Sequence, residues 1–458
     1  MSGGGETYLS AFALLLKAST EQIALLAALP PLLGSFAQLL SAWLGRRIPR
    51  RKTLILAGAG LQALTWLPLA LLPLLFRNHA VMILIGCVTV YYMCGNLIAP
   101  QWTSLMGDLV PERKRGRYFG RRTRYATVMA FLALVSAGLV LDGFDRAGST
   151  VTGYLLVFAA AAVARLVSIY HLARMHEPPR HPMVQELVAG GWLKRARKSS
   201  FLRFSLFVFL MQFAVSIASP FFTVYMLRDL HFSYLQFMAN TATAVVVQIL
   251  TLNTWGRISD AFGNRLILAL TGSLIPFLPA LWLVSTSFWY LIAVQILAGL
   301  SWAGYSLSSG NFLYDLVPSP KRTTYLAFHN TLVNVGLFLG AMLGAWLASA
   351  LPTRFTVAGH EIRWISVLYG VFLVSTLVRA TVAIAFLPRL REVRTVRAMS
   401  LPTLVFRVMR FHALSGLMFD VVTMFRHPPP KPPGDTPGRA GAASPPSAPQ
   451  QPPLTARR

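Results

Sequence analysis

The sequence predicts an all-α polytopic membrane protein, and two observations lead to this fold class. Of the 458 residues, 55% are hydrophobic and only 12% are charged, whereas soluble domains carry about 25% charged residues. The apolar residues also gather in runs of about 20, which is the length of helix that crosses the hydrocarbon core of a bilayer. Because these runs are long and continuous, they do not fit the short alternating strands of a membrane β-barrel.

Eleven such runs follow one another, and each is predicted to form one transmembrane helix. They cover residues 21–45, 53–76, 80–107, 125–145, 151–173, 203–227, 234–255, 266–287, 288–314, 325–350 and 364–388. Ahead of them, residues 8–16 are apolar over only about half a span and follow the polar segment 1–6. We expect a first helix truncated by a misplaced start, with upstream residues missing. The alternative is a short helix that lies in the membrane interface.

The distribution of basic residues predicts which helix ends face the cytoplasm, because cytoplasmic loops are enriched in Lys and Arg. Of the 42 Lys and Arg residues, six lie in the loops of one side, whereas 34 lie in segments 46–52, 111–124, 174–203, 256–265, 318–324 and the tail from 389. The sequence therefore predicts a multi-pass protein of a bacterial inner membrane with a cytoplasmic C-terminus. The net charge of +27 then reflects orientation and attraction to anionic lipid, and nucleic acid is not an expected partner.

Short matches that recur at a nearly constant spacing predict an internal duplication. The sequence DLVP at 108–111 returns at 315–318, and Ser19 and Gln22 have counterparts 214 residues later. Parallel repeats related by an axis along the membrane normal are a recurrent transporter plan. The predicted organisation is an N-terminal helix bundle at 1–173, a cytoplasmic central loop at 174–202, a C-terminal helix bundle at 203–388, a basic amphipathic cytoplasmic segment at 389–426 and a disordered Pro-rich tail at 427–458.

The loop at 256–265, with the sequence GRISDAFGNR, resembles a motif of the major facilitator superfamily. That family carries G-x-x-x-D-R-x-G-R-R-K between helices 2 and 3, often with an echo between helices 8 and 9. In the second copy of this chain the matching residues are Gly256, Asp260, Gly263 and Arg265. In the first copy Arg46 replaces the acid, and the basic residues that remain include Arg47, Arg50 and Arg51.

The resemblance implies two six-helix bundles, here eleven full spans plus the truncated first helix, and a secondary transporter that works by alternating access. It also implies that the motif residues gate the cytoplasmic side. The Asp260 carboxylate could face the N-terminus of a neighbouring helix or accept a bond from Arg, and the alternative is a plain solvated turn. Two other functions stay open, namely efflux or flipping of amphipathic compounds or lipids, and a transporter-like receptor that moves no solute.

The sequence does not indicate an enzyme. It contains no cluster of metal-ligating or nucleophilic residues and no nucleotide-binding loop. We therefore predict no catalytic residue, no metal and no cofactor. The expected partners are a small-molecule substrate and membrane lipid, and the protein is expected to be a monomer.

Two arginines, Arg165 and Arg379, are predicted to lie inside spans, where charged groups are candidates for function. We expect gate or structural pairing, with Asp108 and Asp315 as candidate partners. The alternatives are a role in substrate binding and snorkelling to the lipid head groups. All fifteen acids, Glu6 included, are predicted away from span centres, so the sequence indicates no buried carboxylate for proton coupling.

Neutral polar residues are frequent in several spans, and in the resembled fold helices 1, 4, 7 and 10 line the central cavity. The candidate cavity residues are Asn96, Gln101, Gln212, Trp302 and Tyr305. For each of them the alternative is an interhelical hydrogen bond worth about 1 kcal/mol. A lining of amides and aromatic rings suits a neutral, zwitterionic or anionic organic solute.

Overall fold

A computed structural model of the chain describes residues 5–47, 50–75, 79–110, 112–177, 200–317, 322–352, 354–357, 360–390 and 392. All of them belong to one compact unit, Met1–Val405. Most of the predicted central loop, almost all of the predicted amphipathic segment and the whole Pro-rich tail lie outside the described residues.

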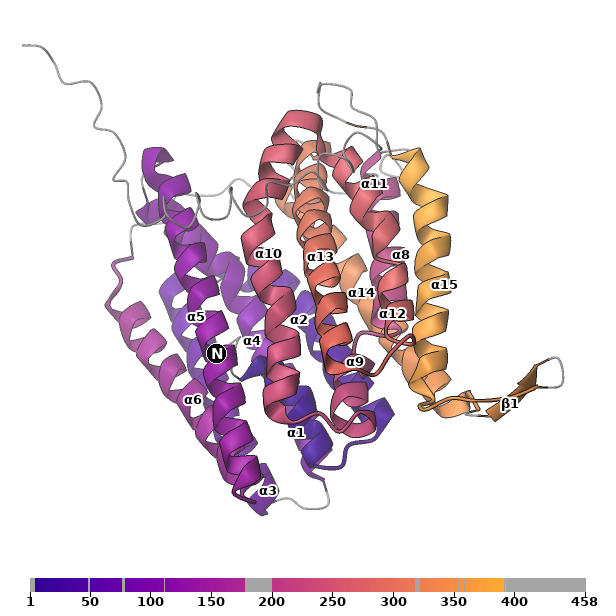
Figure 1. Cartoon of the computed structure of the whole chain (residues 1–458). Helices are drawn as coiled ribbons and strands as arrows, with labels where there is room; N and C mark the ends of the chain where they lie inside the picture. Colours follow the sequence, from indigo (N-terminus) through magenta and orange to yellow (C-terminus); the bar gives the residue numbers. More distant parts are fainter. Residues whose placement is uncertain are drawn as a thin grey trace, which may run out of the picture. The chain divides into compact units, whose positions relative to one another are not determined.

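The first half of the chain forms a helix bundle, drawn from indigo to magenta in Figure 1. Its elements are η1 (Glu6–Tyr8), α1 (Leu9–Leu15), α2 (Thr20–Arg47), α3 (Arg51–Leu75), α4 (Ala80–Leu109), α5 (Glu112–Arg146) and α6 (Thr150–Arg174). The second half forms a similar bundle. Its helical elements are α8 (Ser200–Ser216), α9 (Phe221–Val224), η2 (Tyr225–Asp229), α10 (Tyr234–Phe262), α11 (Asn264–Leu274), α12 (Phe277–Leu281), α13 (Phe288–Leu316), α14 (Arg322–Ala350), α15 (Leu368–Phe386) and η4 (Leu387–Arg389).

Within the described ranges, nine helical segments are long and apolar enough to cross a membrane by length and composition. Two further predicted spans, 21–45 and 53–76, coincide with α2 and α3, which have 28 and 25 residues. The predicted half-span corresponds to η1 and α1. The class of polytopic helical membrane protein is thus confirmed, while the count of eleven full spans stays a prediction.

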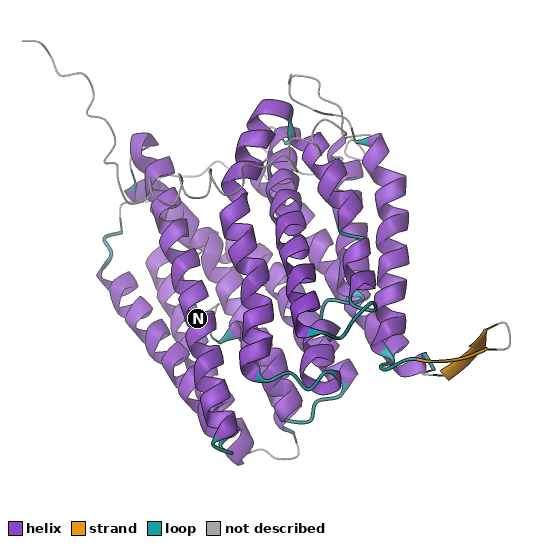
Figure 2. Cartoon of the chain, in the orientation of Figure 1, coloured by secondary structure: helices purple, strands orange, loops and turns teal. Residues whose placement is uncertain are grey.

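One element was not predicted. Strands β1 (Arg354–Val357) and β2 (His360–Arg363) pair antiparallel between α14 and α15, and Figure 2 shows them projecting from the end of the helices. The all-α class is confirmed, and this short hairpin in the connection is an addition that the sequence analysis did not predict. The strands are only four residues long, so their alternation is too short to stand out beside the spans.

The predicted duplication is visible in matching helix starts. Ser19 and Gln22 form a capping box at the start of α2, with backbone-to-side-chain bonds of 2.9 and 3.2 Å. Ser233 and Gln236 form the same box at α10, with bonds of 3.0 and 3.2 Å. A capping box satisfies two backbone N–H groups that a helix start leaves without partners. The same local structure therefore occurs 214 residues apart, as a duplication requires.

The helices run between two ends of the bundle, which are named here for the site that follows. The basic end is where α2, α4, α6, α10 and α13 finish, because the segments rich in Lys and Arg follow these helices. The far end is where α3, α5 and α14 finish. The positive-inside pattern predicts that the basic end faces the cytoplasm.

Buried apolar side chains form three clusters in the described part of the chain, and one of them joins the two halves. The joining cluster combines far-end residues of both halves, such as Tyr8 and Phe237. Toward the basic end, a cluster around Phe204 belongs to the second half and a smaller one around Leu105 belongs to the first. The halves therefore share one core at the far end and keep separate cores at the basic end.

Candidate functional site

The two halves meet through two helix pairs, α2 with α14 and α5 with α10. The α5–α10 pair is in contact at the far end. Asp142, on α5, is buried and accepts a hydrogen bond of 3.3 Å from the backbone N–H of Leu235, in the first turn of α10. It also pairs with Arg146 at 2.7 Å. A carboxylate at a helix start is favoured by the orphan N–H groups and by the helix dipole. Asp142 therefore stabilises contact between the halves.

The same contact is tightly packed around Tyr8. The Tyr8 hydroxyl donates to the backbone carbonyl of Leu134 on α5 (3.0 Å), and its ring lies 5.8 Å from that of Phe237 on α10. Gly138 lies beside them, and a Cβ at this position would stand 2.5 Å from the side chain of Met238. We call the group formed by Tyr8, Gly138, Asp142, Leu235, Phe237 and Met238 the seam.

At the basic end, the described polar contacts stay within each half. In the first half, Arg51 is 2% exposed and pairs with Asp108 at 2.7 Å. In the second half, Asn264 replaces Arg51 and donates to Asp315 at 3.2 Å. Both acids come from the last turn of a helix, α4 or α13, and meet the first residue of an earlier helix, α3 or α11. Neither contact bridges the two halves.

A second pair of equivalent contacts holds the same helix starts. The backbone N–H of Lys52 donates to Glu177 at 3.3 Å, and the backbone N–H of Arg265 donates to Glu392 at 2.8 Å. Each carboxylate thus caps a helix within its own half.

The predicted gating motif is only partly described. Gly263 has a φ of 85° and joins α10 directly to α11, which is a left-handed conformation that favours glycine. Gly256 lies within α10, and a Cβ added there would meet nothing within 4 Å. Arg50 and Arg265 are exposed. The side chains of Arg47 and Asp260 lie outside the described residues, so the gate role of Asp260 stays a prediction.

We expect Asp108→Asn to lower the free energy of unfolding by about 1–3 kcal/mol, because it leaves the Arg51 guanidinium buried without a counterion. The value is below the usual 3–5 kcal/mol for a broken buried pair, since Asp108 is 30% exposed. Thermal unfolding in detergent would measure it. The double variant Arg51→Leu with Asp108→Leu is the control, and it should recover part of the loss. Equal midpoints for Asp108→Asn and the unchanged protein would contradict the role given to the pair.

The two intramembrane arginines have different partners from those predicted. Arg165 donates to the side-chain oxygen of Gln62. Arg379 donates to the backbone carbonyls of Val215 (3.1 Å) and Ile275 (3.4 Å), which lie beside the breaks between α8 and α9 and between α11 and α12. The suggested pairing with Asp108 and Asp315 was therefore wrong, because those acids sit at the basic end while helix breaks and an amide supply acceptors deeper in the bundle.

A polar cluster lies at mid-depth in the first half. Tyr91, about 16 Å along α4 from its start, donates its hydroxyl to Glu6 at 2.6 Å. Gln62 donates to the backbone carbonyl of Tyr91 at 2.8 Å and accepts from Arg165. The prediction that all acids lie away from span centres was wrong for Glu6. Its segment runs inside the bundle toward the far end, so the polar start of that segment lies among the helices.

Two cavities lie on either side of the seam, and both are lined by residues of the two halves. The first, which we call the seam cavity, has a volume of 410 Å³ and is lined by Thr7, Arg122, Thr123, Ala126, Thr127, Ala130, Phe131, Leu134 and Val245. The second has a volume of 390 Å³, and its lining includes Lys17, Asp145, Arg228 and Tyr234. Along α5, Leu134 lines the first and Asp145 the second, with Gly138 and Asp142 of the seam between them.

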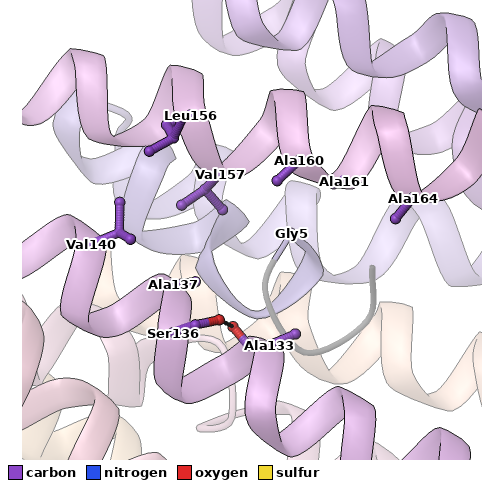
Figure 3. Close-up of a pocket in the computed structure, with 10 residues that line it drawn as sticks. All are labelled: Gly5, Ala133, Ser136, Ala137, Val140, Leu156, Val157, Ala160, Ala161 and Ala164. Atoms are coloured by element: carbon purple, nitrogen blue, oxygen red, sulfur yellow. Dashed lines mark hydrogen bonds between the residues drawn. The ribbon is translucent and has the colours of Figure 1, made fainter.

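A third cavity, of 280 Å³, lies within the first half. Figure 3 shows it between α5 and α6, with Gly5 beside them. Its lining is mostly alanine and valine, and the hydroxyl of Ser136 is already bonded to the backbone carbonyl of Ala133 at 3.2 Å. Because none of the described residues that line this groove belongs to the second half, it is not placed for exchange between the halves.

The five predicted cavity residues do not line the three cavities described above. Gln101 donates to the backbone carbonyl of Ser41 at 2.8 Å, and Tyr305 is buried in the core of the second half beside Trp302. Asn96 donates to the backbone carbonyl of Tyr92 (3.0 Å), and Gln212 donates to Ser216 (3.3 Å). Their contact with a solute stays a prediction.

The residues that the sequence did not single out are those of the seam and of the seam cavity. Asp142 and Arg122 carried a weak signal, since both are charges close to an apolar run. Nothing in the sequence around Thr7, Gly138 or Val245 indicated a site, because these residues come to the seam or the seam cavity only through the packing of the helices.

Two helix bundles that meet through α2 with α14 and through α5 with α10, with a cavity on each side of the seam, are an arrangement suited to a membrane transporter. A model of the MFS_1 like family matches residues 5–357. This match covers most of the chain, and the protein belongs to this family within the major facilitator superfamily, as the loop motif predicted.

Individual similarities are more distant. The chain is 30% identical over 126 residues to the tetracycline resistance protein, class H, of Pasteurella multocida, covering 26% of this chain and 31% of that protein. It is 24% identical over 274 residues to the multi-drug resistance efflux pump PmrA homolog of Lactococcus lactis subsp. lactis (strain IL1403), covering 57% and 64%. The chain thus spans less than two thirds of either relative. The crystal structure of the nucleoside transporter NupG superposes with a TM-score of 0.62 at 14% identity, covering 85% of this chain and 96% of that one, which shows a shared fold.

Proposed function

We propose that the protein moves a small organic solute across the membrane by alternating access between its two halves. In this arrangement the seam closes the far end, and the seam cavity receives the solute from the basic end. Membership in a transporter family supports the general function. The observation that carries the mechanism is the distribution of the buried clusters, which join the halves at the far end and separate them at the basic end.

The physical reason is that packed interfaces are bistable rather than continuously deformable. Apolar surface shared by both halves at one end favours contact there, whereas separate cores at the other end allow the halves to move apart. A rocking motion that closes the basic end would break the bond between Asp142 and Leu235, and the second cavity would then open to the solute.

The mechanism can be tested by distances between spin labels in a cysteine-free background. One pair, Arg121→Cys with Asn253→Cys, reports on the basic end, and a second pair, Ala147→Cys with Thr286→Cys, reports on the far end. All four side chains are exposed. We expect two populations in which one distance shortens while the other lengthens. A single fixed distance for both pairs, with or without added solutes, would contradict alternating access and favour a receptor.

Export of amphipathic compounds is the second candidate function. Two relatives are named as drug-resistance or efflux proteins, and the seam cavity is walled mainly by apolar residues. Uptake and export differ in the direction of net flux. Counterflow and net efflux from reconstituted vesicles, measured with amphipathic and with fully polar solutes, would separate the two.

We expect Asp142→Ala to increase the population with an open far end, because it removes an acceptor for a backbone N–H in the first turn of α10, in addition to the capping box. A cap is worth about 0.5–2 kcal/mol, which corresponds to a change of about 2- to 30-fold in an open–closed equilibrium. The measurement is the rate at which an impermeant maleimide labels Met238→Cys, since Met238 is 7% exposed in the closed seam. Asp145→Ala is the matched control, because Asp145 lies on the same helix and bonds instead to Thr150. If Asp142→Ala and Asp145→Ala are labelled at the same rate, Asp142 does not contribute to closing the far end.

A further inference from the structure

The seam cavity has one charged residue among the described residues that line it, namely Arg122. Its volume of 410 Å³ lies within the range of about 300–1,000 Å³ that is typical of sites for small molecules. The residue at the other end of its α5 wall is Leu134, about 18 Å further along the helix. The cavity is therefore elongated and polar at one end.

The guanidinium of Arg122 is held in place by an aromatic ring. It lies 4.2 Å from the centre of the Trp102 ring, and Trp102 packs in turn against the core of the first half. Stacking uses the flat face of a guanidinium and leaves the N–H donors at its edge available. None of the ion pairs among the described residues includes Arg122. Its charge is thus positioned at the cavity, and no carboxylate in the described part of the chain is paired with it.

The remaining lining changes from polar to apolar along α5. Thr123 and Thr127 lie one above the other on α5, because they are four residues apart, and Arg122 lies beside them above Ala126. Phe131 and Leu134 continue that wall, and Val245 of α10 faces it. The carboxylate of Glu6, next to the lining residue Thr7, accepts the hydroxyl of Tyr91 and does not line the cavity. The lining thus offers a cationic head site and an apolar body site.

We propose that the seam cavity binds an amphipathic organic anion, whose acidic group pairs with Arg122 and whose apolar body lies against Phe131 and Val245. The inference rests on the proposed function and specifies the class of solute. A planar guanidinium binds carboxylate, sulfonate or phosphate groups through two parallel hydrogen bonds. Burial of the apolar body adds affinity in proportion to the area removed from water. The two terms together select against cations and against small fully polar solutes.

The test uses two fluorescent probes that differ by one acidic group. 8-Anilinonaphthalene-1-sulfonate carries a sulfonate, and N-phenyl-1-naphthylamine lacks it. Full-length protein in detergent is titrated with each probe, and the sensitised emission on tryptophan excitation is recorded, since Trp102 lies beside the head site. We expect saturable emission for the sulfonate and only linear partitioning into micelles for the neutral probe. Arg122→Gln should weaken the saturable component about tenfold or more, and Arg122→Lys should retain part of it.

Arg121→Gln is the matched control, because Arg121 is exposed as Arg122 is and precedes it on α5, but is not among the lining residues. It should bind the sulfonate like the unchanged protein. The proposal is overturned if the sulfonate does not saturate, if the neutral probe saturates equally well, or if both variants lose affinity alike. Binding in detergent requires no transport. The two proposals can therefore fail separately. Saturable sulfonate binding together with fixed spin-label distances would contradict alternating access but not the anion site. Spin-label distances that change, without saturable sulfonate binding, would contradict the anion site but not alternating access.

Discussion

Gly138→Leu is expected to open the far end of the protein and to reduce transport by about tenfold or more. A Cβ at this position would stand 2.5 Å from the Met238 side chain and 2.6 Å from the Tyr8 hydroxyl. No side chain fits there while α5 and α10 stay in contact. Inserting a large residue in a packed site costs about 1–3 kcal/mol, and this cost falls on the closed seam but not on a state in which the halves have separated there.

The measurement is the distance between labels at Ala147→Cys and Thr286→Cys, which should lengthen, together with solute flux in reconstituted vesicles. Gly143→Leu provides the control, since Gly143 also lies on α5 but has nothing within 4 Å of an added Cβ. If the two leucine variants give the same distances and fluxes, the seam does not act as the far-end gate.

Gly340→Leu is expected to destabilise the folded protein by about 3 kcal/mol or more, near or beyond the upper end of the usual range for overpacking. On α14, Gly336, Gly340 and Gly344 lie against the backbone of α8 and of the residue after it, at Phe209, Phe213 and Ile217. Close approach of two helix backbones is a common use of glycine in membranes. A side chain at Gly340 would meet the Phe213 carbonyl, which cannot rotate away as a flexible side chain can, so the two helices must separate.

Thermal unfolding in detergent would measure this loss, with Gly310→Leu as the control. Gly310 also lies within a long helix of the second half but has open space around it. Substitution by alanine at both sites sharpens the comparison. Ala favours a helix over Gly by about 1 kcal/mol, so Gly310→Ala should be neutral or stabilising while Gly340→Ala destabilises. A stabilised Gly340→Ala would show that the two helices are not in close contact.

Features that depend on neighbouring residues were predictable from the sequence. The spans follow from long apolar runs, and the capping boxes at Ser19 and Ser233 follow from the spacing of Ser and Gln three residues apart. The repeat of DLVP marked the ends of α4 and α13 correctly. The family followed from the loop at 256–265, whose Gly263 has the left-handed backbone that such a tight connection needs.

Contacts between distant residues could not be predicted in this way. Asp142 falls near the end of the predicted span 125–145, and nothing near it in the sequence indicates that it meets Leu235, 93 residues later. Glu6 was predicted away from span centres, whereas the bundle brings it to Tyr91. Arg379 finds its acceptors at helix breaks, one of them next to Pro279, which has no N–H to donate to the Ile275 carbonyl.

The sequence by itself determined that the protein is a helical membrane protein, that short motifs recur in its two parts and which end of its helices is basic. These properties depend on composition, periodicity and local spacing, because the bilayer requires long apolar helices whose backbone bonds are satisfied internally. Only the tertiary structure decided that α5 and α10 form the seam and that Arg122 faces a cavity between the halves. Those positions depend on how whole helices pack, since the contact of Gly138 with Met238 limits how closely α5 and α10 approach each other.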